Sequence, residues 1–153
     1  MPTRFEQSVM IDAPVRFVWE QLTRTERMKE WMGEPEMEIE IDTDWDVGGP
    51  IAVSGLLHHV RIRNAGVVLE FKPPTSLSYT HLSSLSRLPD EPESYTTLSF
   101  RLQPVDDLTS LTLVATGFPT VTILKHLQLY WRGTLGILKQ HTEQRWELEG
   151  GRQ

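Results

Sequence analysis

The sequence predicts an α+β domain in which a curved antiparallel sheet wraps around a long C-terminal helix. In successive runs between residues 36 and 117, apolar and polar residues alternate, which is the pattern of strands with one buried face. From residue 120 to about residue 146, apolar residues instead recur at helical spacing. The apolar face of such a sheet has to be buried, and the last helix is the only predicted element long enough to cover it.

Length and composition indicate one folded domain, residues 1–153, with residues 149–153 as a fraying tail. The chain has 153 residues, of which 39% are hydrophobic and 24% are charged, ordinary values for a globular protein. Its net charge of −6 argues against nucleic acid or an anionic membrane surface as a partner. It has no cysteine, and no apolar run reaches the roughly 20 residues that span a membrane. A cytoplasmic protein without disulfides or thiol chemistry is therefore expected.

The first predicted elements are a strand and two short helices. Residues 4–12 alternate between apolar and polar positions and predict the strand. Pro14 suits the first turn of a helix over residues 14–23, because a missing N–H costs nothing there. A second helix over residues 25–32 is predicted to have Thr25 as its N-cap.

An acidic residue occupies every second position of EPEMEIEIDTDWD, residues 34–46. The pattern predicts a strand from Glu36 onward, with its inward face formed by Met37, Ile39, Ile41 and Trp45. The acidic face is either a solvated strand surface or a docking surface for a basic partner, formed by Glu36, Glu38, Glu40 and Asp42.

No metal site is expected. The segment starting at Asp42 begins like a calcium loop, but Val47 stands where the turn glycine belongs and Val53 where the bidentate glutamate belongs. His58 and His59 are adjacent in a predicted strand, so they point to opposite faces and cannot share an ion. No spaced zinc-ligand or phosphate-binding motif is present, and no cofactor is expected.

The remaining elements are five strands and the long helix. The strands cover residues 51–59, 60–72 and 76–83, followed by a hairpin of residues 95–104 and 108–117. One stripe of the helix is formed by Leu124, Leu127, Trp131, Leu135, Leu138 and Thr142. Gly133 and Gly136 lie roughly opposite Trp131.

A pocket is predicted between the sheet and the last helix, near the two short helices. Residue spacing places on its wall Trp31, Trp45, Leu57, Leu69, Phe71, Tyr79, His81, Phe100, Leu127, Trp131 and Leu135. Tyr79 and His81 are the best polar pair, because they are two apart on one strand face. They are either hydrogen-bonded residues at the rim of the core or a general acid and base.

Several short stretches, in their order, resemble a known family. These are Pro14 after the first strand, Trp31 at the end of the second helix, VGGP (47–50) after Trp45, GVVLEFKPPTSLSYTH (66–81) and YWRGTLGILKQH (130–141). The chain thereby resembles the START-like (SRPBCC) superfamily and, within it, proteins similar to the activator of the heat-shock protein 90 ATPase. The resemblance implies a helix-grip fold with a cavity, and it leaves the activity open because the superfamily includes carriers, cyclases, hydrolases and chaperone partners.

Three functions remain open from the sequence. The leading one is noncatalytic binding of a small apolar or amphipathic molecule between sheet and helix. The second is protein interaction, with a chaperone as the partner that the family name suggests, through the acidic face. The third is an enzyme of cyclase or hydrolase type that uses His81 and Tyr79. The chain is expected to be a monomer or a homodimer, with Leu129 and Ile137 as candidate contact residues for a dimer.

Overall fold

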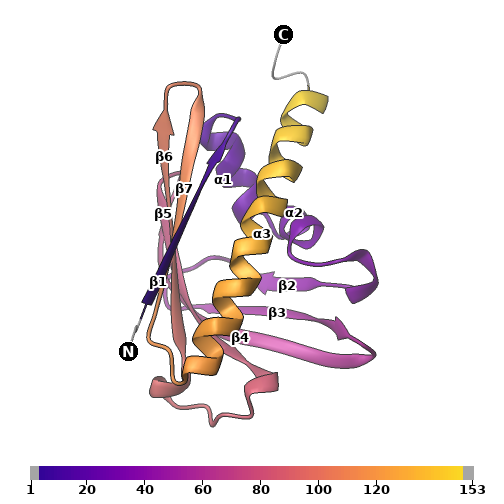
Figure 1. Cartoon of the computed structure of the whole chain (residues 1–153), viewed down its shortest axis with the longest axis vertical. Helices are drawn as coiled ribbons and strands as arrows, with labels where there is room; N and C mark the ends of the chain where they lie inside the picture. The colour runs from indigo at the N-terminus through magenta and orange to yellow at the C-terminus, as the bar shows by residue number, and fades with distance from the viewer. Residues whose placement is uncertain (1–3, 150–153) are drawn as a thin grey trace.

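The structure is a computed structural model that describes residues 4–149, in which seven strands form one antiparallel sheet (Figure 1). The strands are β1 (Arg4–Ile11), β2 (Glu40–Thr43), β3 (Pro50–Leu57), β4 (Val60–Lys72), β5 (Ser76–Ser83), β6 (Thr96–Val105) and β7 (Leu108–Thr116). They lie in the order β1-β7-β6-β5-β4-β3-β2. The helices are α1 (Val15–Thr23), α2 (Thr25–Trp31) and α3 (Val121–Leu148), with short 3₁₀ turns η1 (Pro35–Met37), η2 (Ser84–Ser86) and η3 (Pro92–Ser94).

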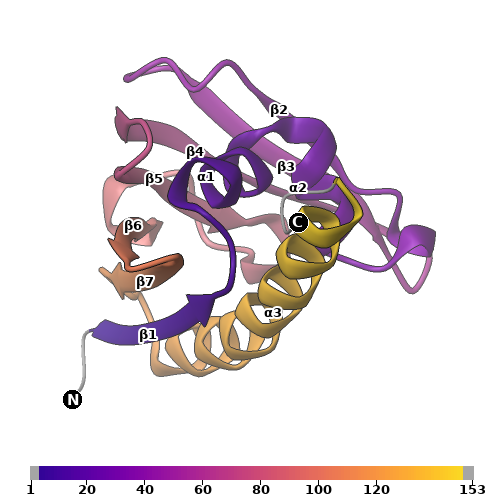
Figure 2. The ribbon, with the colours of Figure 1, turned by 90° about the horizontal axis from the view of Figure 1, so that it is seen from above.

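The sheet curves around the helices, as the sequence predicts. Seen from above, it runs from β1 through the middle strands to β2, with α1 inside the curve (Figure 2). Helix α3 lies on the same side and spans the space between the two ends of the sheet (Figure 2). The predicted helix-grip arrangement is confirmed. None of the helices within residues 4–149 is both long enough and apolar enough to cross a membrane.

Helix α3 follows its predicted pattern closely. The Thr120 hydroxyl oxygen accepts a hydrogen bond from the backbone N–H of Ile123 at 3.1 Å, which caps the helix. All six residues of the predicted apolar stripe are buried. Gly133 and Gly136 are exposed, and an added Cβ at either would meet no atom within 4 Å. The predicted tail lies outside the described residues except for Glu149, whose N–H donates to the carbonyl of Arg145 at 2.9 Å.

The prediction that Thr25 caps α2 is wrong, because Arg24 occupies that position. Arg24 is a single extended residue (φ −70°, ψ 127°) that ends α1 and also precedes the first residue of α2. Its N–H donates to the Glu20 carbonyl at 3.0 Å, and its carbonyl accepts from Met28 at 2.9 Å. With one residue serving both helices, Thr25 is already helical and makes no side-chain cap.

The acidic segment forms a much shorter strand than predicted. Pro35 opens the 3₁₀ turn η1, and Glu38 takes a left-handed backbone conformation (φ 49°), so regular pairing starts only at Glu40. The predicted division between faces is nevertheless observed. The acids are exposed, whereas the alternate residues are half-buried, namely Met37, Ile39, Ile41 and Trp45.

Two further departures concern β3 and β4. His58 and His59 lie in the turn between these strands rather than on a strand, and both have left-handed backbones (φ 50° and 68°). In β4 the pairing with β5 shifts between Val68 and Glu70, which leaves Leu69 as an extra residue in a β-bulge. The bulge turns Val68 into the core and Leu69 outward, with exposed fractions of 0% and 47%.

Candidate functional site

Five aromatic side chains from five parts of the chain meet between the sheet and α3, and we call them the aromatic cluster. They are Trp45, Phe71, Tyr79, Phe100 and Trp131. Trp45 stacks on Phe71 with ring centroids 5.2 Å apart, and its edge meets Tyr79 at 6.0 Å. Tyr79 stacks on Phe100 at 6.1 Å, and Phe100 meets the edge of Trp131 at 5.4 Å. These separations lie within the range where aromatic pairs attract one another.

Residues of α1 and α2 close the end of the aromatic cluster. Trp19 of α1 contacts Phe71 at 5.3 Å, and Trp31 of α2 contacts Trp131 at 6.4 Å. The Trp31 indole N–H donates to the backbone carbonyl of Gln21 at 2.8 Å, which fixes its ring. The two short helices therefore form a third wall of the site, as the sequence predicts.

Among the described residues 4–149, the space between these walls is almost filled rather than open as the sequence predicts. The hollow that remains there has a volume of about 10 Å³, which is room for roughly one water molecule. It is lined by Leu22, Met28, Trp31, Trp45, Leu77, Tyr79 and Phe100. The large rings that were expected to surround a ligand occupy the space themselves.

The structure brings together most of the predicted wall residues. Buried ones are Trp31, Tyr79, Phe100, Leu127, Trp131 and Leu135, and half-buried ones are Trp45, Phe71 and His81. Leu57 and Leu69 were wrongly placed on the wall: they are 37% and 47% exposed. Leu57 lies next to the β3–β4 turn, and the bulge rotates Leu69 outward.

Three residues that line the remaining volume were missed, namely Leu22, Met28 and Leu77. A signal for two of them was present in the sequence. Leu77 shares strand parity with Tyr79, and Leu22 falls on the apolar stripe of α1. For Met28 we find no comparable signal.

Trp45 is held in an unusual position on the connection between β2 and β3. Its backbone is left-handed (φ 59°), a conformation that costs a bulky residue on the order of 1–2 kcal/mol. Its indole N–H donates to the Thr23 carbonyl at 2.7 Å, and its backbone N–H donates to the Thr43 hydroxyl at 3.0 Å. These bonds hold a half-buried ring over Tyr79 at the outer end of the aromatic cluster.

Tyr79 is the member of the aromatic cluster that carries a hydroxyl group. The side chain is 7% exposed, and its hydroxyl makes no hydrogen bond to any residue within 4–149. Burial, with a smaller contribution from Tyr130, raises the pKa of Tyr79 above its usual value of 10. The hydroxyl is therefore protonated at neutral pH and can both donate and accept a hydrogen bond.

His81 lies two residues further along β5. Burial first and the nearby His126 second lower the pKa of His81 from 6.5 to about 4. Its imidazole is therefore neutral at pH 7 and only a weak base. A neutral imidazole and a protonated phenol suit hydrogen bonding to a ligand better than proton abstraction.

Charged groups near this site do not form a metal centre. Within residues 4–149, no three side chains of His, Asp or Glu come close enough together to hold a metal ion.

The acidic face lies on the outer side of β2 and the turn before it. All four of its carboxylates are exposed and none forms an ion pair with another described residue, namely Glu36, Glu38, Glu40 and Asp42.

The sequence matches one protein family over most of its length. Residues 12–143 fit the family described as Activator of Hsp90 ATPase homolog 1-like protein. A search of curated proteins finds no match to this chain.

Solved structures of similar proteins share the fold. A protein of Chromobacterium violaceum (CV1439) is 19% identical, with a TM-score of 0.78 over 93% of this chain and 99% of its own. A protein of Cytophaga hutchinsonii (ChR145) is 27% identical, with a TM-score of 0.77 over 96% and 99%. A protein of Nitrosomonas europaea (NE0264) is 23% identical, with a TM-score of 0.76 over 94% and 96%. Their descriptions state no activity, so they support the fold alone.

Proposed function

We propose that this chain, which belongs to the Activator of Hsp90 ATPase homolog 1-like family, binds a small amphipathic molecule within its aromatic cluster. The observation that carries the proposal is Tyr79, whose side chain is 7% exposed within the aromatic cluster and whose hydroxyl has no hydrogen-bond partner among residues 4–149. A flat apolar ligand with one polar group would stack between the rings and form a hydrogen bond with this hydroxyl.

Binding requires one ring to leave, because only about 10 Å³ is free. Trp45 is the ring best placed to move, since it is half-buried, has a left-handed backbone and lies outside any strand. Its outward movement would break the hydrogen bond to Thr23 and the ring contacts with Phe71 and Tyr79. Breaking these interactions costs on the order of 3 kcal/mol. At that free-energy difference, roughly 1% of the molecules are in the open form.

Such a minor open form is sufficient for ligand binding. The apparent affinity is reduced by the open fraction, and a ligand that fills the vacated space shifts the population towards the open form. When the Trp45 ring moves out, its backbone is free to leave the left-handed conformation, which relieves the strain of that conformation. The proposal therefore needs no preformed cavity.

A titration with 2-naphthol tests this function. The ¹H–¹⁵N NMR signal of the Trp45 indole N–H is expected to shift with saturation, because the ligand displaces the ring from the Thr23 carbonyl. Tyr79→Phe is expected to weaken binding about fivefold, the effect of one lost hydrogen bond. Tyr95→Phe is the matched control, since the Tyr95 hydroxyl bonds to Asp90 on a surface loop. An unmoved Trp45 signal, or equal affinity of both variants, would contradict the proposal.

A second function is supported by the acidic face. Its four carboxylates are exposed and form no ion pair with any residue between 4 and 149, and the family description names an activator of a chaperone ATPase. We propose as the alternative that this face docks on a basic surface of a chaperone. Binding to purified Hsp90 would then weaken with salt, and the triple variant Glu38→Ala, Glu40→Ala, Asp42→Ala would lose it. Unchanged binding of the triple variant would refute this role.

A further inference from the structure

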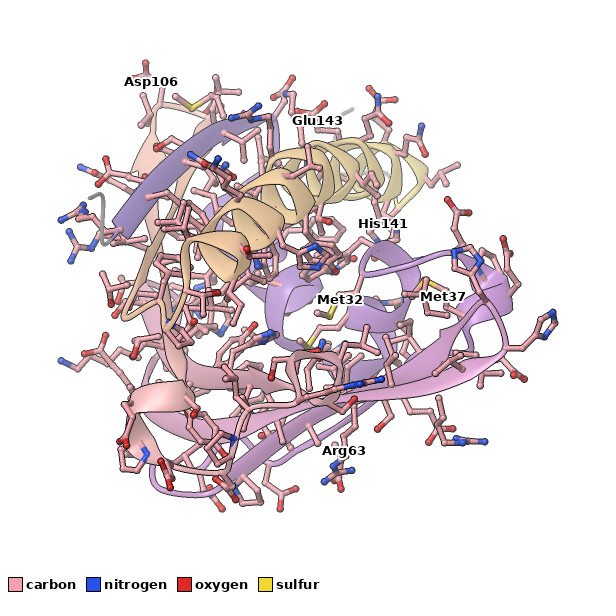
Figure 3. The ribbon with its side chains drawn as sticks, turned by 60° about the horizontal axis from the view of Figure 1, so that its bottom comes forward. Met32, Met37, Arg63, Asp106, His141 and Glu143 are labelled. Carbon is pink, nitrogen blue, oxygen red and sulfur yellow. The ribbon has the colours of Figure 1, made fainter. Side chains whose placement is uncertain are left out.

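A second hollow lies on the outside of the molecule, away from the aromatic cluster. It is a surface cleft of about 590 Å³. It is lined by residues of the β6–β7 turn, of the connection from β1 to α1 and of the last turns of α3. These three segments lie at the same end of the molecule (Figure 1). Figure 3 shows Asp106 of the β6–β7 turn at the outer edge of the molecule. The cleft shares no lining residue with the internal volume.

The polar part of this cleft is entirely acidic. Asp12, Asp106 and Asp107 line it, and no Lys, Arg or His does. Asp106 and Asp107 are exposed and form no hydrogen bond or ion pair with any residue in the described range 4–149. Turn chemistry accounts for an Asp at position 106, where φ is 54°. It does not account for the apolar residues that line the same cleft.

The rest of the cleft lining is apolar and aromatic. Trp146 contributes its indole, which is half-buried and fixed against Phe17 with ring centroids 5.0 Å apart. Val15 and Pro104 add aliphatic surface. A cleft lined by carboxylates and by an indole attracts organic cations, through ion pairing and through the negative face of the ring.

We propose that this cleft binds a small organic cation with an apolar body, such as an arylalkylammonium compound. Its volume falls in the range of small-molecule sites. The ammonium group would lie between Asp106 and Asp107, and the apolar body would lie against Trp146 and Val15. The carboxylates of Asp106 and Asp107 repel anions, and a neutral analogue gives these two carboxylates no counter-charge.

The test uses phenethylammonium as the probe and 2-phenylethanol as its neutral counterpart. In ¹H–¹⁵N NMR at low salt, the indole signal of Trp146 and the amide signals of Asp106 and Asp107 are expected to shift with saturation. Comparison with Trp146→Phe assigns the indole signal. The alcohol is expected to bind at least tenfold more weakly, because it cannot pair with the carboxylates.

Two double variants of equal charge separate a site from a general acidic field. Asp106→Asn with Asp107→Asn is expected to weaken binding at least fivefold. Asp42→Asn with Asp44→Asn removes two exposed carboxylates elsewhere and is expected to change it less than twofold. The proposal is overturned by equal loss in both double variants or by equal binding of the alcohol. It is also overturned if no saturable shift occurs up to roughly 10 mM probe.

Discussion

Acid is expected to destabilise this protein through His81, and the size of the effect follows from its burial. In the folded protein the pKa of His81 is lowered from 6.5 to about 4. As the pH falls below 6.5, the unfolded chain binds a proton that the folded protein does not, so stability is lost progressively down to about pH 4. At about 1.4 kcal/mol per pH unit, the loss amounts to about 3 kcal/mol.

Urea unfolding followed by tryptophan fluorescence between pH 7.5 and pH 4 measures this loss. His81→Gln carries no titrating group, so its free energy of unfolding is expected to fall about 3 kcal/mol less than that of the native chain over this interval.

His59→Asn is the matched control for His81→Gln. His59→Asn removes an exposed histidine from the β3–β4 turn, and Asn tolerates the left-handed backbone there. This variant should follow the native pH dependence. If the native chain and His81→Gln lose stability in parallel, the imidazole is not excluded from water and the description of the site is wrong.

Further substitutions test the packing of the fold by measured free energies of unfolding. Gly136→Ala should stabilise the protein by up to about 1 kcal/mol, because the added methyl meets no atom within 4 Å and Ala favours the helix. Gly66→Ala should destabilise it severely, since its Cβ would lie 1.7 Å from the Thr80 carbonyl oxygen. Equal changes in the free energy of unfolding for Gly136→Ala and Gly66→Ala would refute this packing. Thr109→Val should cost about 1–3 kcal/mol, because the buried hydroxyl donates to the Ala13 carbonyl at 2.8 Å. A neutral result would show that this carbonyl finds another partner.

Elements with a long, uninterrupted period could be predicted from the sequence. The stripe of α3 from Leu124 to Thr142 is buried as expected, and Thr120 caps the helix. The hairpin of β6 and β7 turns at Asp106, as its alternating flanks indicate. In these segments many residues contribute to one pattern, so a single irregular residue does not change it.

The errors arose where one residue changes the backbone. Glu38 adopts a left-handed conformation and shortens β2, although the alternation of side chains continues through it. Leu69 occupies a bulge, so its side chain faces outward against the parity of β4. Neither irregularity can be recognised from the spacing of apolar residues in the sequence. Glu38 ends the 3₁₀ turn η1, and the bulge at Leu69 arises in the pairing of β4 with β5.

The absence of an open cavity could not be predicted for a different reason. Spacing identifies which side chains face inward, but the free volume depends on how their rings fit together. Trp45 illustrates this limit, because its position between Phe71 and Tyr79 depends on a left-handed residue and on a hydrogen bond to Thr23. The sequence predicts which side chains form the aromatic cluster, but it does not predict how closely they pack.

Intermolecular nuclear Overhauser effects between 2-naphthol and the protein test the central claim most directly. If the aromatic cluster admits a ligand, naphthyl protons should show contacts with the ring protons of Tyr79 and Phe100, and the contacts between Trp45 and Tyr79 should weaken at saturation. Contacts confined to surface side chains, with the rings of Trp45 and Tyr79 still together, would show that the space between the sheet and α3 is only a closed core.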